Sequence, residues 1–553
     1  MQKKIPLNLL VFLLYLCFAI LLTYPLVFHF RTHLPGPPTP SDQLTTVWFF
    51  WWFKKALLEG RQVFFSDYIF YPNGVHLMPQ AIDFIPVALA FPLSFFFSFI
   101  VIYNLIFLFF FALAGYFTYL LVDYLVHDRK AAFISGLIFA FMPYLLRLEI
   151  SHLDLLATFV LPLYLLYLLK ATQAPTIKNR LVLGLCFLLG SVAYFYFFIY
   201  LGLLTVVYLV WLWRSQTHPF LPLLKKLLLP LGLALLLQLP LFIVDFRKLP
   251  FFNEVIQGGF KGAETYSVFF YQYFKPFSSF FLGFIPLLGL LILVRFKIYR
   301  QKEIKFWLIS FVLFFILALG PVLHFFKSPT KVILPYWLFQ WIPFLSTLRT
   351  PCRFFVPLML SLTVLTGYAL SFIFQKLKER REIVWWFILP LLCLTVILDF
   401  KRIPIPLFPL EVNPFYQRLA QQKEEFAILE IPFGFSDGFR GRGDEWVEPL
   451  YFQTIHQKKI LNGRVARMNK NQLNVYTQNS LFNTILLFEE KKEVNAQTRE
   501  KAKKQALEIL QKLNIRYILL HQKYFHSPLS EFIQNLGFKK IYQDNKLKVY
   551  EVQ

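Results

Sequence analysis

The chain has 553 residues, of which 57% are hydrophobic and only 16% are charged. A soluble globular protein has about half apolar and about a quarter charged residues, so this composition excludes an ordinary soluble domain. The formal net charge is +25, but much of the basic excess lies in short segments between apolar runs. That pattern is typical of membrane topology signals and of contacts with anionic headgroups, so we expect no nucleic-acid partner.

The first apolar run follows Lys3 and Lys4 and extends to Phe28. It is longer than the apolar core of a signal peptide and has no small-residue cleavage site. We therefore expect an uncleaved first membrane span with the N-terminus in the cytoplasm.

The next segment, residues 29–83, is too polar and too rich in proline to cross a bilayer. It carries Asp42, Asp67 and Asp83, and the aromatic run Trp48–Phe53 suits the headgroup region. Because apolar runs lie on both sides, this segment must form a loop at one membrane face. A loop of this length is usually functional, so we expect one wall of an active site at the water–lipid boundary.

The rest of the first 398 residues is a series of apolar runs. Spans are expected at 102–126, 131–146, 155–169, 181–197, 198–213, 221–244, 280–294, 306–324, 354–374 and 383–398, with a re-entrant segment at 84–100. If the N-terminus is inside, nearly all dense Lys/Arg clusters fall in loops on the inner face, as the positive-inside rule requires. The prediction is a polytopic α-helical domain, residues 1–398, with about eleven transmembrane helices.

From residue 399 the chain becomes polar. Residues 426–431, 516–520 and 546–552 are expected to be strands, residues 497–513 a charged helix, and Asn462-Gly463 a hairpin turn. Residues 399–553 are thus predicted to be a soluble α/β domain on the outer face.

Asp42 is the first candidate for chemistry. It follows a proline-rich stretch and precedes the aromatic run. A carboxylate held at the lipid boundary can accept the proton of a hydroxyl, whereas the structural alternative is a helix N-cap. Asp154 is the second candidate because it lies on the same predicted face with His152 two residues before it. The structural alternative for this pair is a satisfied polar corner.

Arg349 and Arg353 are candidates for binding a phosphate. They bracket the predicted outer start of a span, against the positive-inside trend, and the arginine fork fits phosphate oxygens. Snorkelling to lipid headgroups is the alternative. Arg147, Lys275 and Asp67 are weaker candidates for support. No nucleotide-binding motif is present, so an enzyme of this kind would take its energy from an activated lipid.

The order of these features resembles the GT-C superfamily of membrane glycosyltransferases, and more narrowly uncharacterised bacterial GT-C-like proteins. The matching stretches are Ser41-Asp42, Asp67–Gly74, Phe139–Asp154, Phe344–Phe354, Leu429–Gly434 and Tyr451–Arg464. The resemblance implies transfer of a sugar from a polyprenyl-phosphate donor to an envelope glycan, lipid or protein acceptor. It assigns the essential acid of the first outer loop to Asp42.

The resemblance also implies an inverting enzyme in the bacterial cytoplasmic membrane, with its C-terminal domain in the periplasm or outside the cell. Asp42 stands alone, without the paired acid of some members, so we expect no metal or other cofactor. Two other functions stay open from the sequence. One is a transporter or flippase for lipid-linked glycans, and the other is an envelope-assembly protein without enzymatic activity.

Overall fold

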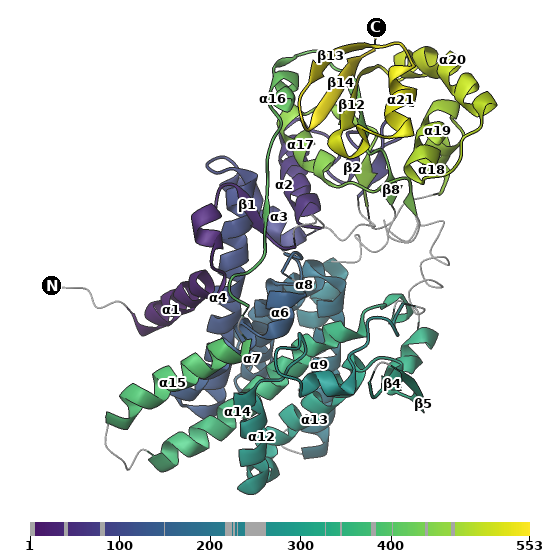
Figure 1. Cartoon of the computed structure of the whole chain (residues 1–553). Coiled ribbons are helices and arrows are strands. Elements are labelled where there is room, and N and C mark those ends of the chain that lie inside the picture. Colours follow the sequence, from purple (N-terminus) through teal and green to yellow (C-terminus); the bar gives the residue numbers. More distant parts are fainter. Residues whose placement is uncertain are drawn as a thin grey trace, which may run out of the picture. The chain divides into compact units, whose positions relative to one another are not determined.

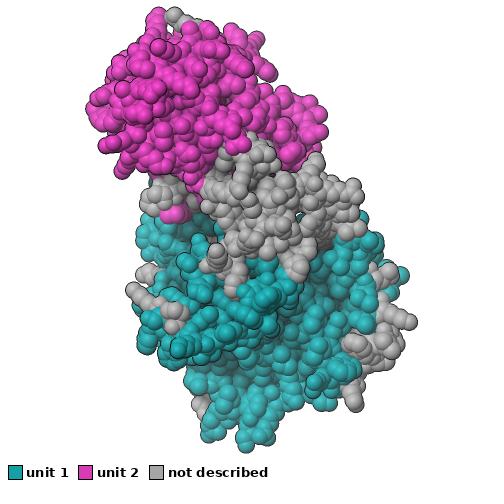
Figure 2. All heavy atoms as spheres, turned by 90° about the vertical axis from the view of Figure 1, so that its right-hand side faces the viewer, with its two compact units in different colours: residues 1–30, 84–86, 103–407 teal, residues 31–83, 87–102, 408–553 magenta. Residues whose placement is uncertain are grey.

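The computed structural model of the chain describes residues 6–37, 42–77, 83–148, 150–215, 224, 227–228, 230–237, 262–326, 328–342, 345–377, 383–400, 402–436, 441–465 and 470–552. These residues form two compact units, which Figure 2 shows in different colours. Unit 1 comprises residues 1–30, 84–86 and 103–407, and unit 2 comprises residues 31–83, 87–102 and 408–553. The long first loop is therefore part of the same unit as the polar C-terminal region.

Unit 1 is built mainly of apolar helices (Figure 1). They are α1 (Leu7–Leu22), α4 (Phe99–Val126), α5 (Arg129–Ala140), α6 (Pro143–Arg147), α7 (Val160–Gln173), α8 (Ile177–Ala193), α9 (Phe195–Ser215), α12 (Phe284–Arg295), α13 (Lys302–Ala318), α14 (Phe355–Leu377) and α15 (Ile383–Phe400). Strands β4 (Val322–His324) and β5 (Pro329–Ile333) form a small hairpin. Among the described residues, four helical segments are long and apolar enough to cross a membrane: Phe99–Val126, Arg129–Arg147, Phe195–Ser215 and Pro351–Leu377.

Most of the predicted spans coincide with helices of unit 1. The run expected at 306–324 is different, because α13 ends at Ala318 and Val322–His324 is a strand. The span expected at 221–244 lies largely outside the described residues, and the count of about eleven spans stays a prediction. At 84–100 the chain forms the short helix α3 (Phe84–Leu93) and then begins α4.

Two glycines allow helices α1, α4 and α5 of unit 1 to pack closely. The Tyr15 hydroxyl of α1 donates to the carbonyl of Phe133 in α5 at 2.9 Å. A Cβ at Gly136 would lie 2.0 Å from that hydroxyl oxygen, and one at Gly115 would lie 2.5 Å from the Tyr15 ring. Small residues at these positions thus let α1, α4 and α5 pack together, as is common between membrane helices.

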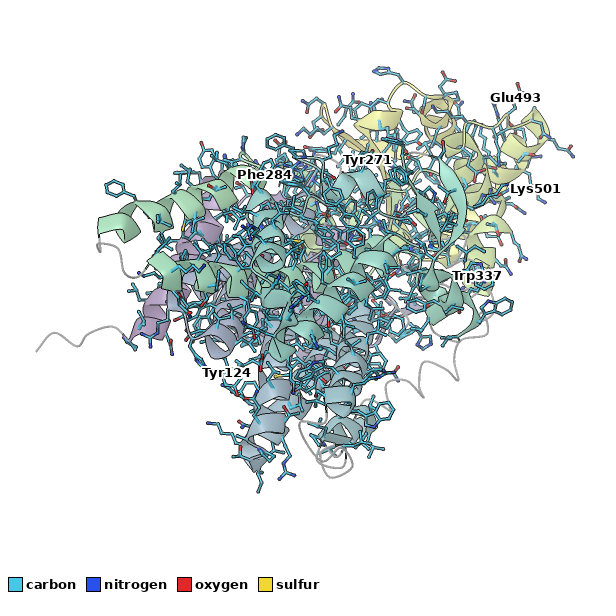
Figure 3. The ribbon with its side chains drawn as sticks, turned by 90° about the horizontal axis from the view of Figure 1, so that it is seen from below. Tyr124, Tyr271, Phe284, Trp337, Glu493 and Lys501 are labelled. Atoms are coloured by element: carbon cyan, nitrogen blue, oxygen red, sulfur yellow. The ribbon has the colours of Figure 1, made fainter. Side chains whose placement is uncertain are left out.

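Within unit 1, three contacts each join segments that are predicted to lie on the same side of the membrane. On the inner side, Tyr124 at the end of α4, labelled in Figure 3, donates to Gln173 at the end of α7. The ammonium of Lys376 lies 4.4 Å from the ring centroid of Phe296. On the outer side, Cys352 donates its backbone N–H to the carbonyl of Tyr266 at 3.1 Å. This grouping is what the predicted topology requires.

Unit 2 contains a mixed sheet in the order β10-β7-β12-β14-β13. Its strands are β10 (Lys459–Ile460), β7 (Ala427–Ile431), β12 (Ile515–His521), β14 (Leu547–Glu551) and β13 (Lys539–Gln543). The first three strands are parallel, and β14 runs antiparallel to β12 and β13. The helices that accompany them are α16 (Pro414–Gln421), α17 (Glu448–His456), α18 (Lys470–Thr477), α19 (Ser480–Glu489), α20 (Ala496–Lys512) and α21 (Pro528–Gln534). The strands and the helix expected from the sequence are present, within one or two residues at most ends.

The first loop contributes helix α2 (Asp42–Leu58) and the strand pair β2 (Phe65–Ser66) and β3 (Val75–His76) to unit 2. Its backbone binds the free edge of β10, since Ile460 donates to the Tyr68 carbonyl and Tyr71 donates to the Ile460 carbonyl. Gln453 of α17 links the same parts through its amide, which accepts from the Trp48 indole at 2.7 Å and donates to the Tyr68 carbonyl at 2.6 Å. The loop is therefore an integral part of the α/β unit.

Two local expectations were wrong. The aromatic run Trp48–Phe53 is buried in the protein, with no side chain in it more than 8% exposed, so it does not form a headgroup belt. The turn at Asn462-Gly463 does not close a hairpin. Instead, β10 pairs with β7 and the strand β11 (Gly463–Arg464) pairs in parallel with β8 (Phe435–Ser436). Strand β9 (Gly441–Arg442) completes this second small sheet.

Candidate active site

Asp42 is ion-paired in unit 2. Its Oδ1 lies 3.2 Å from Nη2 of Arg464, and Nε of the same guanidinium lies 3.2 Å from Oε1 of Glu445. The three side chains are 31–44% exposed, so water reaches them. Asp42 is also the first residue of α2. Its carboxylate is thus held by a guanidinium at a position that solvent and an acceptor can reach.

Local structure explains how Arg464 reaches this position. The amide of Asn462 donates to the Pro432 carbonyl at 2.7 Å, which ties the end of β10 to the end of β7. Gly463 then lies against the ring of Phe70, where a Cβ would be 2.3 Å from Cε2. Only glycine fits there, and the next residue is Arg464. The sequence showed the Asn-Gly-Arg motif, but nothing in it indicated that Asp42 and Glu445 were the partners of Arg464.

The other two aspartates of the first loop have structural partners. Asp67, predicted as a supporting residue, lies 2.6 Å from the ammonium of Lys459 and 3.8 Å from the guanidinium of Arg61. Asp83 is 5% exposed and accepts a hydrogen bond from the hydroxyl of Thr46. The contact of Asp67 with Lys459 holds the loop to β10, and the contact of Asp83 with Thr46 holds α3 to α2.

A second polar cluster lies at the carboxyl ends of β7 and β12. The buried carboxylate of Glu430 accepts from the hydroxyl of Tyr416 and lies 2.8 Å from Nε2 of His521. The centroid of the Trp446 ring is 4.0 Å from that of His521, and burial raises the pKa of nearby Glu448. Trp446 directly follows Glu445, so this cluster and the Asp42–Arg464 pair share one short segment. The sequence gave no motif for this arrangement.

Arg353 is the better placed of the two predicted phosphate binders, both of which lie in unit 1. Its guanidinium carbon lies 5.2 Å from the ring centroids of both Tyr194 and Tyr196, and the guanidinium donates to the Tyr194 hydroxyl. The Tyr196 hydroxyl also bonds to Thr350 at 2.8 Å. Two tyrosines thus contact the Arg353 guanidinium, whereas Arg349 is exposed.

The remaining predicted residues of unit 1 occupy the outer loops. Asp154 is 7% exposed and His152 half-buried, in a turn whose Ser151 carbonyl accepts from the Tyr103 hydroxyl. Arg147 donates to the carbonyl of Phe277. Lys275 is exposed beside the ring of Tyr271, which Figure 3 labels. Asp42 and Asp67 belong to unit 2. The candidate residues of unit 1 and those of unit 2 therefore form two separate groups.

The residues around Asp42 do not form a ready divalent-metal site. A metal needs free carboxylate oxygens, but here one guanidinium lies between Asp42 and Glu445 at 3.2 Å from each. No group of three or more His, Cys, Asp or Glu side chains with metal-binding geometry occurs within the described ranges. We therefore derive no step through a metal ion.

No protein-family model and no curated protein matches the sequence. Solved structures do match over nearly the whole chain. ArnT from Cupriavidus metallidurans bound to undecaprenyl phosphate matches with a TM-score of 0.54 and 12% sequence identity, over 98% of each chain. The apo oligosaccharyltransferase of Archaeoglobus fulgidus matches with a TM-score of 0.54 and 14% identity, over 94% of this chain and 70% of that one. The arabinofuranosyltransferase AftD from Mycobacteria matches with a TM-score of 0.59 and 14% identity, over 98% of this chain and 40% of that one.

The fold of this chain is therefore GT-C-like, which confirms the resemblance drawn from the sequence. Similarity at these identities shows the fold alone. The roles of Asp42, Asp154, Arg349 and Arg353 stay predictions.

Proposed function

We propose that the protein is a membrane glycosyltransferase that transfers a sugar from a polyprenyl-phosphate donor to an acceptor hydroxyl or amide, with inversion. The observation that carries the proposal is the Asp42–Arg464 pair at the start of α2, in a chain with a GT-C-like fold. One similar structure contains undecaprenyl phosphate, and another contains a dolichol-phosphate with an inhibitory peptide. These ligands support a lipid phosphate as the donor carrier here.

The proposed reaction is a direct displacement at the anomeric carbon. The acceptor oxygen or nitrogen attacks, the bond between the anomeric carbon and the phosphate oxygen breaks, and polyprenyl phosphate leaves with the electron pair. A proton must leave the acceptor, and Asp42 accepts it as a general base, which typically accelerates a reaction about 10²–10⁴-fold. Arg464 orients the carboxylate of Asp42 between turnovers.

Arg353 is proposed to bind the donor phosphate. Charge develops on that phosphate as the sugar leaves, and a guanidinium held in place stabilises the transition state without reorganising. The contacts of the Arg353 guanidinium with Tyr194 and Tyr196 hold it in place. Arg349 stays a second candidate, and Asp154 with His152 stays the rival for the base.

We infer that the reaction needs no divalent metal, because the guanidinium of Arg464 already supplies positive charge beside Asp42. We also infer that the protein lies in the bacterial cytoplasmic membrane with unit 2 on the outer side. The clustering of Lys and Arg in the predicted inner loops supports this orientation.

The experiment uses purified full-length protein in liposomes with radiolabelled polyprenyl-phosphate sugars and an extract of envelope glycans, lipids and proteins. A glycosyltransferase yields a labelled acceptor and free polyprenyl phosphate in equal amounts, with or without a chelator. A transporter would instead move the intact labelled donor between leaflets without releasing polyprenyl phosphate. Movement without release, or no turnover of any donor, would contradict the proposal.

A further inference from the structure

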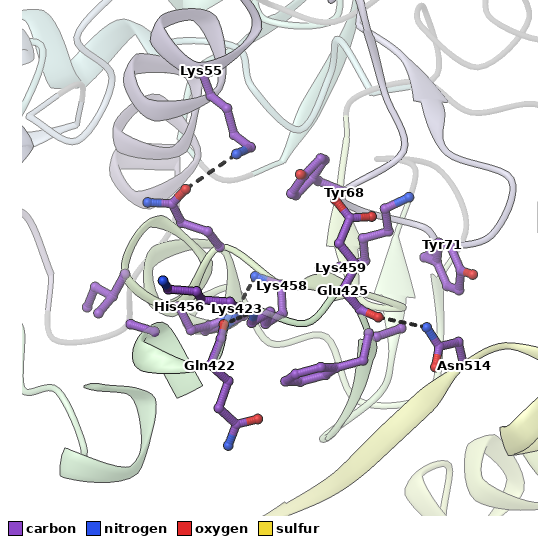
Figure 4. A pocket seen from close by; sticks show the side chains of 15 residues that line it. Lys55, Tyr68, Tyr71, Gln422, Lys423, Glu425, His456, Lys458, Lys459 and Asn514 are labelled. Carbon is purple, nitrogen blue, oxygen red and sulfur yellow. Dashed lines mark hydrogen bonds between the residues drawn. The ribbon is translucent and has the colours of Figure 1, made fainter. Parts of the chain in front are cut away.

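Unit 2 contains a hollow of about 420 Å³ that is separate from the Asp42–Arg464 pair (Figure 4). It lies where β7 and β10 begin, between the end of α17 and Lys55 of α2. Arg464, by contrast, follows the other end of β10. The hollow is much larger than a single phosphate ion and falls in the size range of small-molecule sites.

The wall of the hollow is strongly positive. Four lysines line it, and Glu425 is the one carboxylate among its lining residues. The lysines are Lys55, Lys423, Lys458 and Lys459. The carboxylates that pair with Lys55 and Lys459 are Glu59 and Asp67, which are not part of the lining. An anion inside the hollow would therefore face ammonium groups first.

Only one of these lysines is committed to the backbone. Lys458 donates to the carbonyls of Gln422 and Glu424 at the end of α16, which is a structural role. Burial lowers the pKa of Lys458, the carboxylates of Glu424 and Glu425 raise it, and Arg516 and Lys55 lower it. Nearby carboxylates thus balance part of the positive charge of the lining.

The remaining residues that line the hollow can bind the hydroxyl groups and the ring of a sugar. The side-chain amides of Gln422, Gln457 and Asn514 can each donate and accept, as sugar hydroxyls require. Tyr71 is half-buried beside Lys459, whose ammonium lies 5.3 Å from the ring centroid. The wall thus combines amides and an aromatic edge with cations.

We propose that this hollow binds an anionic saccharide, that is, a sugar carrying a carboxylate or a phosphate ester. The lysines bind the acid, and the amides bind the hydroxyls. The inference rests on the hollow alone and does not depend on the proposed sugar transfer.

The test is calorimetric binding to the full-length protein in detergent. The probes are digalacturonate and glucose 6-phosphate, with cellobiose as the neutral sugar and inorganic phosphate as the anion without a sugar. We expect one or both charged sugars to bind at least about tenfold more tightly than cellobiose and inorganic phosphate, and less tightly at high salt. Digalacturonate alone would identify the acid as a carboxylate, and glucose 6-phosphate alone as a phosphate ester.

The variant Lys55→Gln/Lys423→Gln should weaken binding of the charged sugar at least about tenfold. Its control, Lys503→Gln/Lys540→Gln, removes the same charge from exposed lysines that do not line the hollow and should bind as the wild type does. Because Lys55 packs on Tyr68, the single variant Lys423→Glu, at an exposed position, serves as a second test.

Three results would overturn the proposal: no binding of either charged sugar at millimolar concentration, equal binding of cellobiose or inorganic phosphate, or equal losses in the variant and its control. The variant Asp42→Asn should bind the sugars normally, which separates this site from the proposed base.

Discussion

Arg464 determines the chemistry available to Asp42. The carboxylate is not simply an exposed loop acid, because a guanidinium at 3.2 Å holds it and also holds Glu445. Arg353 likewise has specific partners, since its guanidinium contacts Tyr194 and Tyr196. The structure thus identifies partners for charged residues that the sequence showed only as a pattern.

The first prediction compares Arg349 and Arg353, the two arginines that precede α14. Arg353→Ala should lower sugar transfer on the order of 10²-fold or more, by analogy with losing one transition-state donor. Arg353→Lys should recover only part of that loss, because lysine lacks the planar fork that donates two parallel hydrogen bonds to a phosphate. Arg349→Ala is the comparison. If Arg349→Ala loses more activity than Arg353→Ala, the donor phosphate is held by Arg349.

The second prediction concerns His456 and pH. Burial, with a smaller effect of Lys458, lowers the pKa of His456 to about 3, against an ordinary value of 6.5. Between these two values the unfolded chain binds a proton that the folded chain does not, so stability falls as the pH drops below about 6.5. Lowering the pH from 7.5 to 5 should cost the wild type about 2 kcal/mol more than His456→Gln.

This difference is measured by chemical denaturation of both proteins in detergent at the two pH values. Other groups, such as Glu489, whose pKa is raised by burial to about 7, titrate in both proteins and cancel. Equal pH dependence of the two proteins would show that His456 is protonated in the folded state.

Individual elements show which sequence signals were sufficient and which were not. Strands β7, β12 and β14 and helix α20 were predicted because their apolar periodicity is local. The aromatic helix α2 was placed wrongly because its apolar residues surround the whole helix, so sequence alone does not tell a lipid-facing helix from a buried one. The turn at Asn462-Gly463 misled because β10 pairs with β7 and β11 with β8, and these partners lie far away along the chain.

The same limit applies to the candidate site. Asp42 and Arg353 were recognisable as charges at the predicted ends of apolar runs. Their partners, Arg464 and the pair Tyr194 and Tyr196, come from distant segments and left no local pattern. Glu445 and the cluster of Glu430 with His521 were missed for the same reason.

One prediction tests the contact of α1, α4 and α5. Gly136→Ala should destabilise the protein by about 1–3 kcal/mol, because the new Cβ would meet both the Tyr15 hydroxyl and the Gly115 carbonyl. Gly202→Ala in α9 is the control, since nothing lies within 4 Å of a Cβ there. Thermal unfolding in detergent should show a lower midpoint for Gly136→Ala only. Equal midpoints for the two variants would mean that the three helices are not closely packed.

For the whole molecule, the fold is GT-C-like and the first loop is joined to the C-terminal region in one α/β unit. A loop that is part of this unit must lie on the same side of the membrane as the C-terminal residues. The orientation is therefore a single question, and one labelling experiment answers it.

The prediction is that unit 2 lies outside the cytoplasm. Single cysteines at Asn73 and Lys503, both exposed in unit 2, should react with an impermeant thiol reagent in intact cells. A cysteine at Lys178, an exposed residue in the first turn of α8, should react only after lysis. The background has the four native cysteines replaced. Labelling of Lys178→Cys in intact cells, or protection of the two sites in unit 2, would reverse the orientation.

The central claim is that Asp42 accepts the proton of the acceptor during sugar transfer. Its most direct test is the rate of transfer by Asp42→Asn, measured in a single turnover with saturating labelled donor in liposomes. Asparagine keeps the size of the side chain and can still cap α2, so a structural role predicts little change. Loss of the base predicts a rate about 10²–10⁴-fold lower, with donor binding and the unfolding midpoint unchanged. Wild-type transfer by Asp42→Asn, alongside an inactive Asp154→Asn variant, would contradict the account and assign the role of base to Asp154.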